Sequence, residues 1–369
     1  MTLVPPDDTT RAGTAMTDAE YGASRSTLWT GASALITDTS GRVLVQRVDY
    51  RDVHLLPGGA VDAHESPSRA AAREALEELG VTAHYTRGLA VDWIPSNTPG
   101  YPAETRFPGE ILFVYDGGTW NAEQIAAVRL PDREILAIDF AEPARLPDIM
   151  EPGDARRTLS ALRARINGTT TLLEDGRPLD PTPLDRHRVL ATARKPQHWS
   201  WHSATVPSGL PLQQSWGWLF APDGRVLVLI GTDTGSACLP GGTVDPGDHG
   251  GPSATLRRET AEEANARIGE QLLHLGYLYD DNAAQQPGPC ARVRMAGRLA
   301  GFGPWRPAPA TGHTYARLLA TPEQVCELFD WGPEGDHQVA AVHAAREQLG
   351  LPRPTRQSVT ELPRRGGIL

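Results

Sequence analysis

Cysteine is scarce in this chain, and the few residues present are widely spaced. Only three occur in 369 residues, at Cys238, Cys290 and Cys326, and no two of them form a C-x-x-C pair. This spacing predicts neither a disulfide framework nor a structural zinc site. We therefore expect reduced thiols and a cytoplasmic location.

Long apolar runs and an excess of positive charge are also missing. No stretch is long and apolar enough to span a bilayer, and the N-terminus lacks the pattern of a signal peptide. The formal net charge of −10 argues against binding to a nucleic acid polymer. A hydrophobic fraction of 40% and a charged fraction of 22% are typical of a globular protein, and the length suits two domains.

The most informative stretch is residues 58–81, which holds glycines, glutamates and an arginine at fixed offsets. In chain order these are Gly58, Gly59, Glu65, Arg73, Glu74, Glu77, Glu78 and Gly80. A helix over 68–79 places Glu74, Glu77 and Glu78 on one narrow face. Like charges on one face repel one another, so such a face is either solvated or binds a cation. Because Mg²⁺ takes oxygen ligands together with substrate phosphates, the pattern predicts a magnesium site.

This stretch resembles the signature of the Nudix hydrolases at every fixed position, with Ala75 as a mild departure at one aliphatic position. The resemblance implies an α/β/α sandwich and a requirement for Mg²⁺, with Mn²⁺ as a substitute. It also implies a small-molecule nucleotide substrate. The expected reaction is hydrolysis of the phosphoanhydride of a nucleoside diphosphate derivative, or of a nucleoside triphosphate, by metal-activated water.

The resemblance also implies roles for single residues. The expected metal ligands are the Gly59 carbonyl, Glu74, Glu77 and Glu78. Glu65 and Arg73 are expected to hold the loop and the helix in register, and either Glu74 or Glu78 to take the proton from the attacking water. An acid outside the motif often assists in this family. Glu110 and Glu104 are candidates by position, and the sequence does not choose between them.

The pattern occurs a second time. Leu239-Pro240-Gly241-Gly242 repeats residues 56–59, and residues 258–265 repeat residues 73–80. The candidate residues of this second site are Gly242, Asp248, Arg258, Glu259, Glu262 and Glu263. The copy departs from the first in three respects: Asp248 replaces the early glutamate, the loop is two residues longer, and Asn265 replaces the capping glycine. We predict a second metal site, with packing or substrate selection as the alternative role.

The predicted fold class is α/β (α+β), with two tandem Nudix-type α/β/α sandwich domains on mixed sheets. The predicted segments are a disordered N-terminus (1–26), Nudix domain 1 (27–178, motif 59–81), an inter-domain connection (179–211), Nudix-like domain 2 (212–351, motif 242–266) and a disordered tail (352–369). We expect the two domains to pack against each other. A homo-oligomer remains open.

Three functions compete on the sequence alone. The intact first motif favours a hydrolase. A nucleotide sensor without turnover would usually carry a DNA-binding segment, and the sequence shows neither a helix-turn-helix candidate nor a basic face. Isomerisation of an isoprenoid diphosphate would require a cysteine in the first domain, which has none. The substrate itself is left open, since its selection is expected in loops 95–109 and 280–290.

Overall fold

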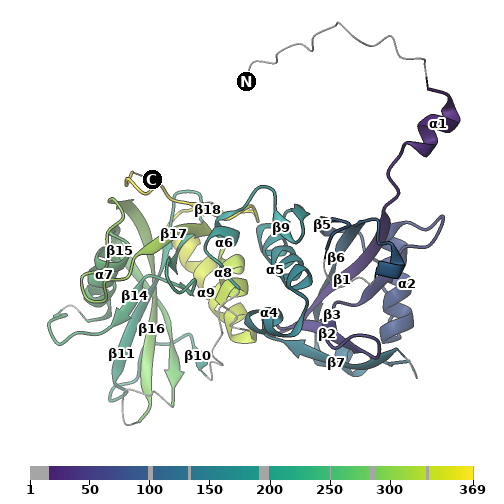
Figure 1. Cartoon of the computed structure of the whole chain (residues 1–369). Coiled ribbons are helices and arrows are strands. Elements are labelled where there is room, and N and C mark those ends of the chain that lie inside the picture. The colour runs from purple at the N-terminus through teal and green to yellow at the C-terminus, as the bar shows by residue number, and fades with distance from the viewer. Residues whose placement is uncertain are drawn as a thin grey trace, which may run out of the picture.

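The computed structural model describes residues 16–98, 103–131, 134–190, 199–249, 251–281, 288–329 and 332–368. Within these residues the chain forms two lobes, each built on its own nine-stranded sheet (Figure 1). Both sheets combine parallel and antiparallel pairs. This arrangement confirms the predicted fold class.

The first sheet has the order β3-β2-β1-β6-β5-β8-β9, with β4 paired to β1 and β7 to β2. Its strands are β1 (Trp29–Asp38), β2 (Val43–Val48), β3 (His54–Leu55), β4 (Gly58–Ala60), β5 (Gly88–Ile94), β6 (Glu110–Trp120), β7 (Ile135–Ala141), β8 (Thr171–Glu174) and β9 (Arg177–Pro178). Its helices are α2 (Pro67–Leu79), η1 (Ala103–Thr105), α3 (Ala122–Ala126), η2 (Pro143–Arg145), α4 (Leu146–Ile149), α5 (Pro152–Asn167) and α6 (Pro183–Arg186). Alternate residues of β1 face opposite sides, with Ala34 packing in the cluster under α2 and Leu35 in the cluster under α5.

The second sheet repeats this plan in the order β10-β15-β16-β11-β12-β17-β18, with β13 paired to β12 and β14 to β11. Its strands are β10 (Ser200–His202), β11 (Leu212–Phe220), β12 (Val226–Gly231), β13 (Ala237–Cys238), β14 (Gly241–Thr243), β15 (Ala266–Asp280), β16 (Cys290–Phe302), β17 (Tyr315–Ala320) and β18 (Thr360–Glu361). Its helices are α7 (Pro252–Glu263), α8 (Pro322–Phe329) and α9 (Gly332–Gln348). In both lobes the strand that pairs with the motif strand also runs parallel to a later central strand. These parallel pairs are β1 with β6 and β11 with β16.

The first motif helix matches its predicted range of 68–79 to within one residue, and the second contains the three acids predicted to lie on it. Helix α2 starts with Pro67 in its first turn and ends at Gly80, which has the left-handed φ of 67°. It buries Ala71, Ala75 and Leu79 against the sheet. In the second lobe Asn265 takes the left-handed conformation after α7, with φ of 46°. Asparagine tolerates this region better than most residues, so the replacement preserves the helix ending.

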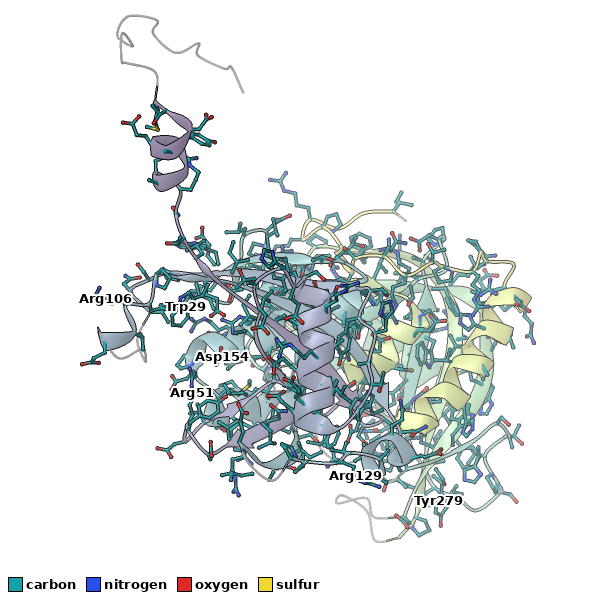
Figure 2. All side chains as sticks on the ribbon, turned by 90° about the vertical axis from the view of Figure 1, so that its right-hand side faces the viewer. Trp29, Arg51, Arg106, Arg129, Asp154 and Tyr279 are labelled. Carbon is teal, nitrogen blue, oxygen red and sulfur yellow. The ribbon has the colours of Figure 1, made fainter. Side chains whose placement is uncertain are left out.

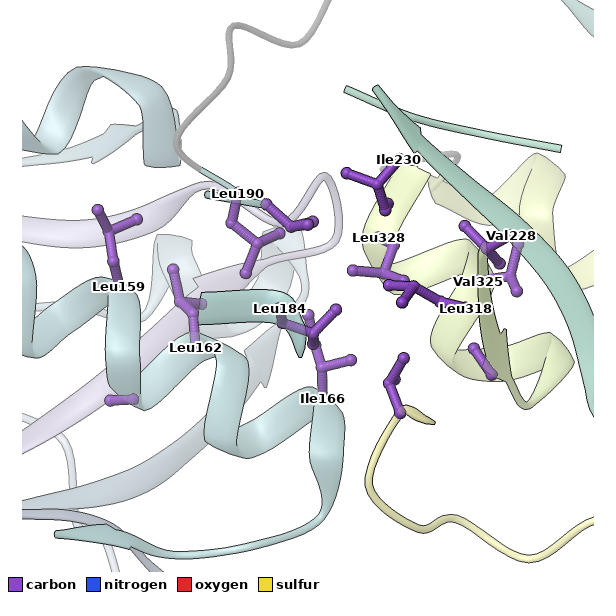
Figure 3. Packing of buried hydrophobic residues seen from close by; sticks show 14 of the residues in the cluster. Leu159, Leu162, Ile166, Leu184, Leu190, Val228, Ile230, Leu318, Val325 and Leu328 are labelled. Carbon is purple, nitrogen blue, oxygen red and sulfur yellow. The ribbon is translucent and has the colours of Figure 1, made fainter. Parts of the chain in front are cut away.

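The two lobes are joined by a shared hydrophobic cluster. Figure 1 shows α5, α6, α8 and α9 between the two sheets, with α2 and α7 on the outer sides. Figure 3 shows the buried side chains that meet there. From the first lobe they include Leu159, Leu162, Ile166, Leu184 and Leu190, and from the second Val228, Ile230, Leu318, Val325 and Leu328. The motif helices therefore lie far from the interface.

The C-terminal tail is ordered, and the prediction of disorder for 352–369 is wrong over residues 352–368. Strand β18 pairs with β17, and Val359 and Leu362 are buried. Composition predicts disorder because the tail is rich in proline and arginine and holds few apolar residues of its own. Those few are buried by the lobes on which the tail lies, which composition does not show.

The tail also connects the lobes through the end of α5. The last carbonyls of a helix have no partner within the helix and need outside donors. Arg356 Nη1 donates to the carbonyl oxygens of Arg165 (3.3 Å) and Ile166 (3.0 Å), and Gln324 Nε2 of α8 donates to Ile166 O (2.7 Å). Both donors come from beyond the first lobe.

Two other expected segments differ from the structure. Of the N-terminus predicted to be disordered, residues 1–15 lie outside the described residues, and Asp18–Ala23 form helix α1 with a capping box at Thr17. Within the expected connection, β10 already pairs with β15, so the second sheet begins earlier than predicted. Residues 191–198 of that connection lie outside the described residues.

Two expectations from composition concern membranes and thiols. Among the described residues no helix combines the length and apolarity that a bilayer crossing needs. Cys238, Cys290 and Cys326 are all free thiols. The structure therefore contains no disulfide among its three cysteines.

Candidate active site

One arginine organises the carboxylates of the first motif. Arg73 Nη1 donates to Glu74 Oε1 (2.8 Å) and to Glu77 Oε2 (2.9 Å). Its Nε and Nη2 donate to the two oxygens of Glu65 (3.2 and 3.1 Å), and Nη2 also donates to Ala60 O (2.9 Å). The planar guanidinium therefore ties the helix, the loop and β4 together with charge-assisted bonds. The structure thus brings together four residues of the motif that the sequence singled out, Glu65, Arg73, Glu74 and Glu77.

Glu78 lies deeper than the other three acids of the motif. Its side chain is buried, and Oε2 accepts from the Gly58 amide (2.8 Å) and from Gln46 Nε2 (3.0 Å). Burial raises the pKa of Glu78 to about 7, in spite of these two donors. Burial also raises the pKa of Glu74. A carboxylate kept from water in this way gains from a cation that replaces the lost hydration.

The backbone of the motif turn approaches these acids closely. A Cβ at Gly59 would lie 2.5 Å from Glu74 Oε1, so a side chain at this position would displace the carboxylate. The side-chain donors gathered here are carboxylate oxygens, which suit a hard divalent cation such as Mg²⁺. Among the described residues no three acidic, histidine or cysteine side chains converge as in a preformed metal centre. Arg73 donates to Glu74 and Glu77, while Glu78 accepts from the Gly58 amide.

A cavity of about 1090 Å³ opens beside the motif turn. Its walls include Gly58, Gly59 and Glu65 of the motif, and Met150 and Arg157 from the region of α4 and α5. Figure 2 shows Trp29, Arg51 and Asp154, which also line the cavity, on the same side of the first lobe. A volume of this size is sufficient for a nucleotide-sized ligand.

The acids considered outside the motif fall in different places. Glu110 lines the cavity, whereas Glu104 lies in η1, is exposed and is not among the cavity walls. The sequence analysis missed Glu134, which precedes β7 and has a left-handed φ of 75°. Burial is the largest cause of the raised pKa of Glu74 and of Glu78. The negative charge of Glu134 is a smaller cause that raises the pKa of both. No motif surrounds Glu134, so its approach to the motif acids depends on the tertiary fold.

The second motif reproduces the arginine network. Arg258 donates to both oxygens of Asp248 (3.0 Å each), to Glu259 Oε1 (3.0 Å) and to Glu262 Oε2 (3.5 Å). Glu263 Oε2 accepts from the Gly241 amide (3.3 Å), and burial raises the pKa of Glu263 to about 8. Gly242 again leaves room for a carboxylate, since a Cβ there would lie 2.5 Å from Glu259 Oε1. The shorter Asp248 therefore replaces Glu65 without loss of the network.

The surface beside the second motif differs from that of the first. The pairing of β14 with β11 corresponds to that of β4 with β1 in the first lobe. By this correspondence, Gln214 and Trp216 are equivalent to Gly31 and Ser33. Trp216 Nε1 donates to Gln214 Oε1 (3.0 Å), and Arg292 of β16 also donates to Gln214 Oε1. Arg292 in turn stacks on Trp199 at 4.5 Å. Large side chains therefore occupy the face of the second sheet that corresponds to the cavity floor of the first.

Comparison with known proteins identifies one family. The family model described as NUDIX domain matches residues 27–162 and 215–303. No curated protein matches the chain.

Among solved structures, similarity extends over about one lobe at a time. The MutT protein of Methanosarcina mazei is 24% identical with a TM-score of 0.30, over 37% of this chain and 93% of its own. An ADP-ribose pyrophosphatase of Streptococcus suis is 19% identical with a TM-score of 0.31, over 40% and 99%. The NUDIX domain of Shewanella oneidensis NrtR, in complex with ADP-ribose, is 17% identical with a TM-score of 0.31, over 40% and 97%.

Proposed function

The chain belongs to the NUDIX family of pyrophosphohydrolases, and we propose that its first domain hydrolyses the phosphoanhydride of a nucleoside diphosphate derivative with Mg²⁺. The observation that carries this proposal is the arginine-held acid network of α2 beside a cavity of about 1090 Å³. The cytoplasm, where its free thiols would stay reduced, is the proposed place of action.

The proposed mechanism divides the work among residues already described. Glu74, Glu77, Glu78 and the Gly59 carbonyl would hold Mg²⁺, with Mn²⁺ as a substitute. The cation, when bound, would neutralise phosphate charge and lower the pKa of water. Arg73 and Glu65 would position these ligands by holding the loop against the helix. A neighbouring carboxylate would accept the proton from the attacking water.

The identity of the proton acceptor is testable at Glu134. Glu78 accepts hydrogen bonds from Gly58 and Gln46, and Glu74 accepts one from Arg73. Glu134, in contrast, is exposed, and its charge contributes to the raised pKa of both acids. We expect Glu134→Gln to lower kcat by about a hundredfold, the lower end of the usual range for a general base, with little change in KM. Steady-state kinetics would measure this, with Glu104→Gln as the control. An unchanged kcat would mean that Glu134 does not accept the proton, and Glu74 or Glu78 would then be the expected acceptor.

For the second domain we propose a packing or substrate-selecting role. It retains an acid network that suits a cation, but Gln214, Trp216 and Arg292 occupy the face where the first lobe has its cavity. Trp216 is much larger than Ser33, which lines the cavity of the first lobe, so room for a substrate is reduced at this position. Cation binding there is compatible with this role.

The proposed function is tested by product analysis. The purified chain would be incubated with Mg²⁺ and a panel of nucleoside diphosphate derivatives and nucleoside triphosphates, and the products separated by chromatography. A nucleoside monophosphate with a phosphorylated partner, or with pyrophosphate, is the expected result. Binding of Mg²⁺ and a nucleotide without any turnover would replace the hydrolase with a nucleotide-binding sensor.

A further inference from the structure

The cavity contains a carboxylate that no role in the proposed mechanism uses. Glu110 begins β6 and pairs with Trp29 at the start of β1. Its carboxylate lies over Gly31, where a Cβ would come within 2.4 Å of Glu110 Oε1. Glycine at this position therefore keeps open the place that the Glu110 carboxylate occupies.

This carboxylate has no hydrogen bond or ion pair within the described part of the chain, although it is partly buried. Burial raises its pKa, and the neighbouring charges that act on it are those of Arg157, Asp154, Arg51 and Asp92. Its oxygens remain accessible from the cavity, so a ligand with hydrogen-bond donors can bind to them.

The arginine next to Glu110 is already neutralised by two aspartates. Arg157 Nε donates to Asp92 Oδ2 (2.7 Å), and Nη1 donates to Asp154 Oδ1 (2.5 Å). Both Arg157 and Asp92 are buried. The acidic recess formed by Glu110, Asp154 and Arg157 therefore presents hydrogen-bond acceptors without a spare positive charge. A further phosphate placed there would meet carboxylates.

An aromatic ring stands beside this recess. Trp29 lines the cavity with 46% of its surface exposed, and Phe107 supports it edge-on at 5.3 Å between ring centres. An aromatic face offers apolar contact to C–H groups, and adjacent carboxylates accept from hydroxyl groups. A sugar ring presents both surfaces, C–H groups on its face and hydroxyls at its edge.

We propose that Trp29 and the acidic recess form a subsite for an uncharged sugar, so that the first domain selects a nucleoside diphosphate sugar over a nucleoside triphosphate. The inference rests on the proposed function and narrows its substrate class. Arg51, at the exposed side of the same cavity, remains available to a phosphate of the diphosphate. Discrimination then depends on what is attached beyond the second phosphate.

The test compares matched substrate pairs, ADP-ribose with ATP and UDP-glucose with UTP, in the full chain with Mg²⁺. The parent is expected to have the higher kcat/KM for the sugar derivative of each pair. Glu110→Gln keeps the shape and removes the charge, and should lower kcat/KM for ADP-ribose about tenfold, mainly through KM, because a bond to a charged acceptor is lost. The ratio of sugar derivative to triphosphate should fall at least as much. Trp29→Ala should lower the same ratio.

Matched controls separate recognition from folding. Trp93 is 45% exposed and is not a cavity wall, so Trp93→Ala should leave the ratio unchanged. Thermal unfolding would verify that each variant folds. A parent that prefers the triphosphates, or a Glu110→Gln variant that lowers kcat equally for both members of a pair, would overturn the subsite. The latter result would instead make Glu110 part of the chemistry.

Failure of the proposed function would look different. If the parent turns over none of the four substrates, hydrolysis fails as a function, and calorimetry of ADP-ribose and ATP with the parent then tests the subsite alone. Tighter binding of ADP-ribose that is lost in Glu110→Gln supports the subsite. Equal binding of the two nucleotides contradicts it.

Discussion

Glu78→Gln is expected to abolish hydrolysis, whereas Glu263→Gln should leave it within about twofold. Loss of even a second-sphere partner of a metal site typically costs 10- to 100-fold, so loss of a ligand should cost about a hundredfold or more. Glutamine preserves the acceptor for the Gly58 amide but carries no charge for a cation. The second site, in contrast, has Gln214 and Trp216 where the first has its cavity floor.

The two variants control for each other, because each changes the same position of a repeated network. Glu78 is buried and Glu263 is partly buried. Each accepts a hydrogen bond from a glycine amide of its motif turn. Turnover of the full substrate panel would be measured for the parent and both variants. Loss of a different substrate in each variant would show two active enzymes on one chain. Full activity in Glu78→Gln would remove the first motif from the mechanism.

Deletion of residues 352–369 is expected to lower the first unfolding transition by about 10 °C or more. Burial of an aliphatic side chain such as Val359 or Leu362 contributes about 1.5–3 kcal/mol. The deletion also removes Arg356 from the carbonyls at the end of α5 and exposes the edge of β17. For chains of this size about 1 kcal/mol corresponds to roughly 2–4 °C in Tm.

Differential scanning calorimetry would measure this effect, and two substitutions narrow its cause. Val359→Asp places a charge in a buried position and should reproduce much of the loss. Arg353→Ala is the control, because that side chain is 71% exposed and its ion pair with Glu323 is 3.8 Å long. An unchanged Tm after the deletion would mean that the tail contributes no stability to the lobes.

Local patterns were sufficient to predict the motif networks, and the family resemblance carried by the motif implied the fold class. Helical spacing placed Glu74, Glu77 and Glu78 on one face of α2, and Gly80 marked its end, because both depend on residues within a few positions of one another. The same reasoning found the second motif, where Arg258 and Asp248 form the corresponding network. Their roles in catalysis and metal binding remain predictions.

Long-range features escaped the sequence analysis. The partners of the tail, Arg165 and Ile166, lie almost two hundred positions away from Arg356, and composition alone predicted disorder there. Glu134 reaches the motif acids only through the path of the loop before β7. Sequence spacing predicts neither the hydrogen bonds of Arg356 nor the effect of the Glu134 charge on the pKa of Glu78.

Two Nudix-type motifs, with their acids in register on two helices, can be recognised from the order of residues alone. The different surroundings of the two sites become visible only in the folded chain. In the first lobe the pairing of β6 with β1 brings the Glu110 carboxylate over Gly31, and in the second the pairing of β16 with β11 brings Arg292 to Gln214. The physical reason is that a helical motif depends on neighbours in sequence, whereas a cavity depends on which side chains distant strands bring to one face.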